Sequence, residues 1–266
     1  MVVADQVASH VEFIFTHYQE LDGIRLMIGL FLFSVQIYCD FSGYSDIAIG
    51  VARLFGIRLS RNFAYPYFSR NIIEFWRRWN ISLSFWFRDY VYIPLGGNRM
   101  GTARKTYNLF ATFMLCGLWH GANWTYVAWG TLNALYYLPI QSKKKAKVPT
   151  KTIPDLREAL SICFTFFMVM IAWTFFRAPT IADAVNYLGR IMTNFWDPTQ
   201  RGYFGVAVLT SLCLLFVEWI SRHQVHLLQI CCHWPVYFRW LLYYSLVWLL
   251  FFHGNFGYVP FIYFQF

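Results

Sequence analysis

A long uncharged run in the middle of the chain limits the possible folds more than any other feature. Residues 106–140 include no Asp, Glu, Lys or Arg and a single histidine, His120. As one helix this run would extend roughly 50 Å, well beyond the ~30 Å hydrocarbon core of a bilayer. Gly121, Ala122 and Asn123 follow the histidine and offer a break. We therefore predict two short helices that meet near His120.

The composition indicates a membrane protein. Only 13% of the 266 residues are charged, against about 25% in soluble domains, while 58% are hydrophobic and 22% aromatic. The net charge of +9 is explained by basic loops on the cytoplasmic side of the membrane. No basic stretch is interleaved with a soluble, base-stacking surface, so we expect membrane lipid as a partner and no nucleic acid. Residues 1–20 lack the basic start and apolar core of a signal peptide.

The hydropathy pattern predicts an all-α, polytopic transmembrane helical bundle with re-entrant and interfacial helices. Residues 1–23 form an amphipathic or loop segment, and 178–202 form a loop. Residues 53–105 are too charged to span a bilayer and too apolar for a free loop, which indicates short interfacial or re-entrant helices. Within them, Asn71 and Glu74 have the spacing of a helix N-terminal cap. The remaining predicted spans are 24–51, interrupted by Asp40, Gly43 and Asp46, then 157–177, 203–221 and 238–254.

His120 is the main catalytic candidate, because an ionisable side chain deep in an apolar segment is costly unless it has partners or lines a wet cavity. A neutral imidazole can take a proton from a hydroxyl or thiol and return it, as acyl transfer requires. The alternative is a buried histidine that bonds a backbone carbonyl. The adjacent Trp119, the helix break and a polar cluster favour the catalytic interpretation. That cluster comprises Asp40, Ser42, Tyr44, Ser45 and Asp46.

Asp40 and Asp46 lie six residues apart, so on one helix they would point in different directions. This spacing does not fit a metal pair or a glycosidase acid/base pair. Two roles remain open. The carboxylates either form structural ion pairs with Arg77, Arg78 or Arg88, or orient the substrate or the histidine.

We predict no metal site and no bound cofactor. His223 and His226 have the i,i+3 spacing of two metal ligands, but no Cys, Asp or Glu pattern supports them. Phosphate-cradling and serine-hydrolase motifs are absent from the sequence. The six cysteines show no CxxC spacing and are interpreted as free thiols.

Three strings resemble a known family. They are YCDFSGYSDIAIG (38–50), RNFAYPYFSRNIIEFWRRWNISLSFWFRDYVYIPLGGNR (61–99) and GLWHGANWTYVAWG (117–130). Together they resemble the membrane-bound O-acyltransferases, in particular the branch that contains the alginate O-acetyltransferase membrane subunit, and the ending FIYFQF fits that branch too. The resemblance covers nearly the whole chain.

The resemblance implies a helical bundle around a tunnel, with the histidine of the WHG motif, here His120, at its centre. It implies acetyl-CoA or another cytoplasmic acyl thioester as donor substrate. It also implies periplasmic or extracellular acetyltransferase partner proteins, which place the group on an exported polysaccharide. The residues that would bind substrate or support the site are Asn80, Trp119, Asn123, Asp40, Asp46, Tyr44, Arg77 and Trp79.

The chain departs from the family pattern in two ways. Many relatives carry a second histidine after the FWRRW string, where this chain has Asn80, and an amide cannot take up a proton at neutral pH. Relatives are also roughly twice as long, so residues 1–266 correspond to a single, partial membrane domain, the C-terminal half of the family fold.

We therefore expect a membrane O-acyltransferase, with His120 as general base or as covalent carrier of the acyl group. Two alternatives remain open at this stage. One is a transporter or accessory subunit of a polysaccharide export system without chemistry, and the other is an inactive fragment.

Overall fold

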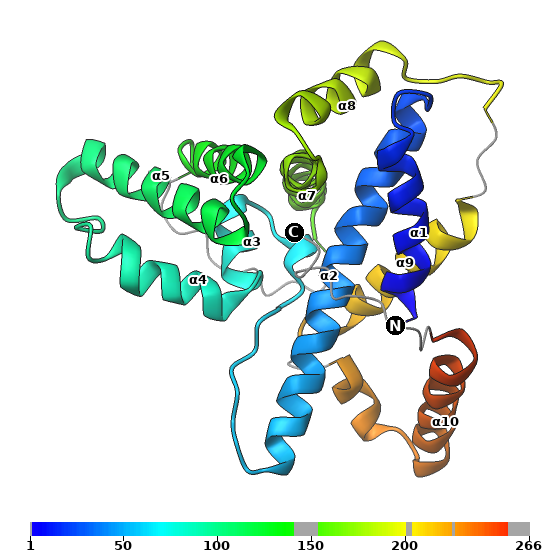
Figure 1. Cartoon of the computed structure of the whole chain (residues 1–266). Coiled ribbons are helices and arrows are strands. Elements are labelled where there is room, and N and C mark those ends of the chain that lie inside the picture. The colour runs from blue at the N-terminus through cyan, green and yellow to red at the C-terminus, as the bar shows by residue number, and fades with distance from the viewer. Residues whose placement is uncertain (1, 141–153, 201–203, 225–226, 255–266) are drawn as a thin grey trace. The chain divides into compact units, whose positions relative to one another are not determined.

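The computed structural model describes residues 2–140, 154–200, 204–224 and 227–254, and these residues form helices and turns without a β-strand (Figure 1). This confirms the predicted all-α class. A basic linker with Lys143, Lys144, Lys145, Lys147 and Lys151, together with His226 and the ending FIYFQF, lies outside the described residues. The α-helices are α1 (Val3–Thr16), α2 (Gly23–Leu54), α3 (Ile72–Arg78), α4 (Ile81–Phe87), α5 (Gly101–His120), α6 (Trp124–Tyr137), α7 (Leu156–Arg177), α8 (Ile181–Thr193), α9 (Gly205–Ser221) and α10 (Val236–His253). Shorter helical turns are η1 (Pro66–Phe68), η2 (Arg88–Tyr92) and η3 (Leu227–His233).

Three of the described helices, α2, α7 and α10, are long and apolar enough to cross a bilayer. The spans predicted at 157–177 and 238–254 thus agree with α7 and α10 within two residues. The span predicted at 203–221 corresponds to α9, which is apolar but shorter. The short helices η1, α3, α4 and η2 lie within 53–105, where interfacial helices were predicted.

Two predictions about where the chain is helical are wrong. Asp40, Gly43 and Asp46 do not interrupt α2, which continues to Leu54. A single helical glycine costs only about 1 kcal/mol, and no proline removes a backbone donor there. The predicted loop 178–202 contains α8, whose Ala184, Tyr187 and Ile191 are buried at helical spacing.

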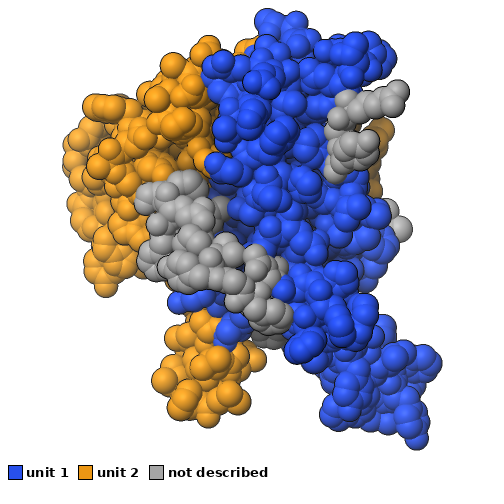
Figure 2. Space-filling model, turned by 45° about the vertical axis from the view of Figure 1, so that its right-hand side comes forward, with its two compact units in different colours: residues 1–47, 190–265 blue, residues 48–189, 266 orange. Residues whose placement is uncertain are grey.

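The chain divides into two compact units, coloured separately in Figure 2. Unit 1 comprises Met1–Ile47 and Arg190–Gln265, and unit 2 comprises Ala48–Gly189 and Phe266. The single membrane domain stays a prediction.

In unit 1, a buried carboxylate connects the start of α2 to the segment after α8. The Asp22 side chain is fully buried and accepts hydrogen bonds from the backbone N–H groups of Arg25 and Asp197, each at 3.0 Å. It also pairs with the Arg25 guanidinium at 2.5 Å. Burial alone would raise the pKa of Asp22, but these donors outweigh it and hold the pKa below its ordinary value.

A second polar contact in unit 1 joins α2 to α9. The Tyr38 hydroxyl donates to the Glu218 carboxylate at 2.5 Å, and both side chains are buried. Sequence analysis did not single out Glu218, although an acidic residue inside an apolar helix requires such a partner.

Candidate active site

His120 is the last residue of α5, and the chain turns at once into α6. This confirms the predicted pair of helices that meet near the histidine. Gly121 follows it without a side chain, and a Cβ there would lie 2.6 Å from the ring of Tyr126. The glycine therefore leaves room for that ring beside the imidazole.

Direct backbone contact holds the α5–α6 hairpin together. A Cβ added to Gly117 would lie 2.2 Å from the Tyr126 carbonyl oxygen, and one added to Gly130 would lie 2.2 Å from the Phe113 oxygen. Such approach is possible only for residues without side chains, as in other close helix pairs. Because Gly117 lies one turn before His120, this contact fixes the histidine relative to α6.

Aromatic rings from three helices surround the His120 imidazole. The ring centres of Trp119, Trp129 and Phe176 lie 4.9, 5.3 and 5.1 Å away, and that of Tyr126 lies 6.4 Å away. Trp129 and Phe176 are buried, whereas the predicted site residue Trp119 is 54% exposed. The histidine thus has a closed aromatic side towards α6 and α7 and an open side at Trp119.

A second row of aromatic side chains connects this site to α3. Trp173 of α7 stacks on Trp129 at 5.9 Å and contacts Phe176 at 5.4 Å. On its other side it contacts Trp79 at 5.2 Å. Trp79, a predicted site residue, is buried and is therefore part of the packing behind the histidine.

Asn80 follows Trp79 and is 4% exposed. Its backbone is left-handed, with φ 40° and ψ 61°, a conformation that asparagine tolerates better than most residues. Asn80 separates α3 from α4, so its position depends on the turn between them. The neighbouring Arg77 is exposed at the surface of unit 2.

Asn123 caps α6. Its Oδ1 accepts from the Thr125 N–H at 3.1 Å, and its Nδ2 donates to the Pro179 oxygen at 3.1 Å. The amide thereby fixes the turn after His120 to the segment after α7. This geometry supports the site rather than contacting the imidazole.

The polar cluster, with Asp40, Tyr44 and Asp46, lies in unit 1, whereas His120 lies in unit 2. Asp40 is half-buried, Asp46 is exposed and Tyr44 is 61% exposed. Their proposed action on the histidine or on arginines of unit 2 stays a prediction. Arg78 and Arg88 have acidic partners within their own unit, Glu74 and Asp89.

A charge network fixes α3 to the start of α7. Glu74 binds Arg70 at 2.9 Å and Arg78 at 2.5 Å, and Arg70 also binds Glu158 of α7 at 3.1 Å. Burial alone would raise the pKa of Glu74, but the two arginines outweigh it and lower the pKa. The predicted cap is confirmed, since Asn71 Oδ1 accepts from the Glu74 N–H at 2.9 Å.

Sequence analysis missed four residues of the aromatic enclosure: Tyr126, Trp129, Trp173 and Phe176. The first two lie within the quoted string 117–130, so their proximity to His120 was accessible. Trp173 and Phe176 reach the site only because α7 packs against α6, which no sequence signal indicated.

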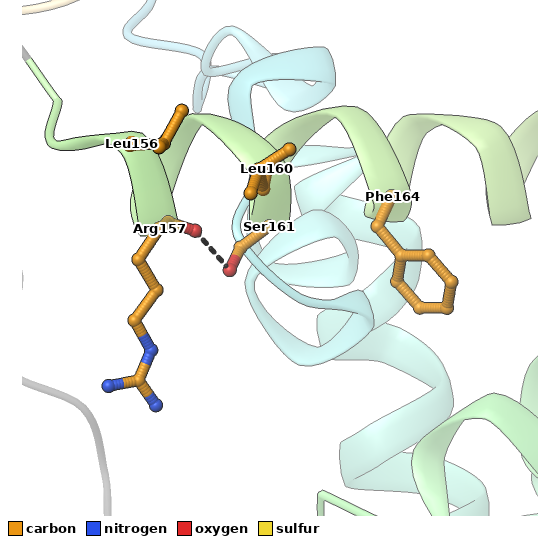
Figure 3. Close-up of a pocket in the computed structure, with 5 residues that line it drawn as sticks. All are labelled: Leu156, Arg157, Leu160, Ser161 and Phe164. Atoms are coloured by element: carbon orange, nitrogen blue, oxygen red, sulfur yellow. Dashed lines mark hydrogen bonds between the residues drawn. The ribbon is translucent and has the colours of Figure 1, made fainter.

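A groove of about 530 Å³ lies elsewhere in unit 2, on the first turns of α7 (Figure 3). The Arg157 side chain extends away from Leu156 and Leu160, and the Ser161 hydroxyl donates to the Arg157 oxygen at 2.8 Å. Exposed apolar side chains dominate its lining. It includes none of the predicted site residues, and we assign it no chemistry.

Among the described residues, no group of three or more His, Cys, Asp or Glu side chains could hold a metal ion. All six cysteines are free thiols, and Cys116 and Cys231 are buried.

Comparison with known proteins places these residues in context. The model of the membrane-bound O-acyltransferase family matches residues 14–178, which include every predicted site residue. The chain is 46% identical to the probable alginate O-acetylase AlgI of Azotobacter vinelandii over 70% of this chain and 36% of that protein. It is 39% identical to the peptidoglycan O-acetyltransferase of Helicobacter pylori over 71% of this chain and 35% of that protein. It is 35% identical to the teichoic acid D-alanyltransferase of Bacillus subtilis over 60% of this chain and 42% of that protein. The alignments thus span about a third to two fifths of the length of these relatives.

Proposed function

This chain belongs to the membrane-bound O-acyltransferase family, and on that premise we propose that it supplies the histidine of a membrane O-acyltransferase. The single observation that carries this proposal is the position of His120 at a helix end, enclosed on one side by aromatic rings and flanked on the other by the exposed Trp119. An imidazole so placed is held rigidly and can still be approached.

The reaction we propose is transfer of a short acyl group from a thioester to a hydroxyl. A His120 ring nitrogen accepts the proton of the attacking hydroxyl, the new C–O bond forms, and the C–S bond breaks. The proton then passes to the leaving thiolate, so the histidine ends as it began. In the alternative route, the imidazole itself first takes the acyl group and releases the thiol. An acyl-histidine trapped with the donor alone would favour that second route.

We further propose acetyl as the acyl group, an exported polysaccharide as the final acceptor and acetyltransferase proteins outside the membrane as partners. The likeness to proteins named alginate O-acetylase and peptidoglycan O-acetyltransferase supports this choice. The protein would cross the inner membrane several times and take acetyl-CoA from the cytoplasm. Exposed arginines of unit 2 could attract the phosphates of the donor, namely Arg53, Arg58, Arg77, Arg99 and Arg104.

His120→Ala tests the proposed function in cells that make the polymer. We expect loss of polymer acetylation, with protein level and polymer export unchanged. His10→Ala is the matched control, because His10 also packs edge-on against a phenylalanine, Phe204 at 5.7 Å, but lies in unit 1. Blocked export with acetylation intact on the residual polymer would instead identify a transporter.

A further inference from the structure

The indole N–H of Trp173 stands out among the polar groups near His120. The side chain is 2% exposed, and its Nε1 is buried with no hydrogen-bond partner among the described residues. A buried donor left unpaired costs about 1–3 kcal/mol. The contrast with Trp76 is clear, since that indole donates to Asn133 Oδ1 at 3.2 Å.

The Trp173 ring, which carries the unpaired donor, lies one ring away from the histidine. Trp173 contacts Trp129 and Phe176, with ring centres 5.9 and 5.4 Å away. The same two rings contact His120 at 5.3 and 5.1 Å. The imidazole and the indole thus share the same two aromatic neighbours, and a carbonyl group can reach both only if Trp129 and Phe176 move apart.

We propose that Trp173 is a further catalytic residue, whose N–H donates a hydrogen bond to the carbonyl oxygen of the acyl thioester during transfer. This inference rests on the proposed function. When the hydroxyl adds to the carbonyl carbon, the C=O π electrons move to the oxygen, which becomes negative. The oxygen then reforms the double bond as the thiolate leaves, and His120 handles the proton in both steps.

The indole suits this task for two physical reasons. It is a donor without acceptor capacity, so it cannot turn the wrong way towards a carbonyl. It is also neutral and lies among apolar rings, where a hydrogen bond to developing negative charge is stronger than in water. The same rings would select a small acyl group, because a longer chain would have to displace more of the packed side chains.

Trp173→Phe tests the proposal, with Trp76→Phe as matched control. Both changes shrink the ring equally, but the first removes an unpaired N–H and the second removes a bonded one. We expect Trp173→Phe to lower the kcat for transfer from acetyl-CoA about 100- to 1,000-fold. The KM should change little, and the melting temperature should be no lower than that of the control. Trp76→Phe should keep the wild-type kcat per folded protein and melt earlier, because Asn133 loses its donor.

The measurements use the complete protein in its own membrane with its partners. Wild-type kcat in Trp173→Phe would overturn the inference, as would an activity loss that merely follows the amount of folded protein. His120→Ala, measured in parallel, distinguishes failure of the proposed function from failure of the role of Trp173 alone. If that variant still transfers acetyl, the proposed function fails. If it is inactive while Trp173→Phe is fully active, only the role of Trp173 fails.

Discussion

Replacing Gly117 by alanine tests whether the contact between the α5 and α6 backbones holds His120 in place. The new Cβ would lie 2.2 Å from the Tyr126 oxygen and 2.8 Å from its carbonyl carbon, whereas ordinary contacts begin near 3.4 Å. Neither neighbour is the end of a flexible side chain. The two helices must therefore separate by about 1 Å near this position.

The expected effect on activity is larger than the effect on stability. Overpacking of this kind costs about 1–3 kcal/mol, but alanine regains up to ~1 kcal/mol of helix propensity over glycine. A net loss of roughly 0–2 kcal/mol leaves a folded protein. A displacement of about 1 Å at a reacting group, by contrast, can reduce a rate about 100-fold. His120 lies one turn after Gly117 and moves with it.

The assay compares acetyl transfer per folded protein with the melting temperature in detergent. Gly189→Ala in α8 is the control, because a Cβ there meets nothing within 4 Å. We expect this control to be as active as the wild type and slightly more stable. If Gly117→Ala has both the wild-type rate and the wild-type melting temperature, the backbone contact does not position the histidine.

Three further predictions concern stability. Asp22→Asn should cost about 1–3 kcal/mol at pH 7, because it weakens the pair between the buried Asp22 side chain and the half-buried Arg25 guanidinium. Folding lowers the pKa of Asp22. The wild type should therefore keep its extra stability above pH ~4 and lose it as the pH falls through the pKa of Asp22 in the folded protein. The melting temperature of Asp22→Asn should not show this fall. Glu74→Gln should lower the free energy of unfolding by about 2–4 kcal/mol in chemical denaturation, because Arg70 and Arg78 lose their carboxylate partner. Asn80→Ala should cost about 1–2 kcal/mol, and Asn80→Gly should cost less, because only glycine adopts φ 40° without strain.

Local features of the fold were accessible from the sequence because they depend on neighbouring residues. The break after His120 follows from Gly121 to Asn123, and the start of α3 follows from the spacing of Asn71 and Glu74. The errors have the same origin. Asp40, Gly43 and Asp46 were interpreted as residues that interrupt a helix, although a helix as long as α2 tolerates them.

The back of the site was not accessible, because α7 is apolar on nearly every side. A helix without a distinct polar face gives no periodic signal for the direction of each side chain. Trp173 and Phe176 therefore could not be distinguished from other apolar residues of α7. Only the packing of α7 against α6 brings them to the histidine.

The left-handed backbone at Asn80 gives the departure from the family pattern a physical meaning. Asparagine, aspartate and histidine are the side-chain-bearing residues most enriched in this conformation. A change between histidine and asparagine at this position can therefore keep the turn between α3 and α4 while removing the proton-accepting nitrogen. On this argument, Asn80→His should leave the melting temperature nearly unchanged. If its only effect were on the pH dependence of acyl transfer, position 80 would act through its side chain, whereas loss of folding would show that the buried site accepts only the amide.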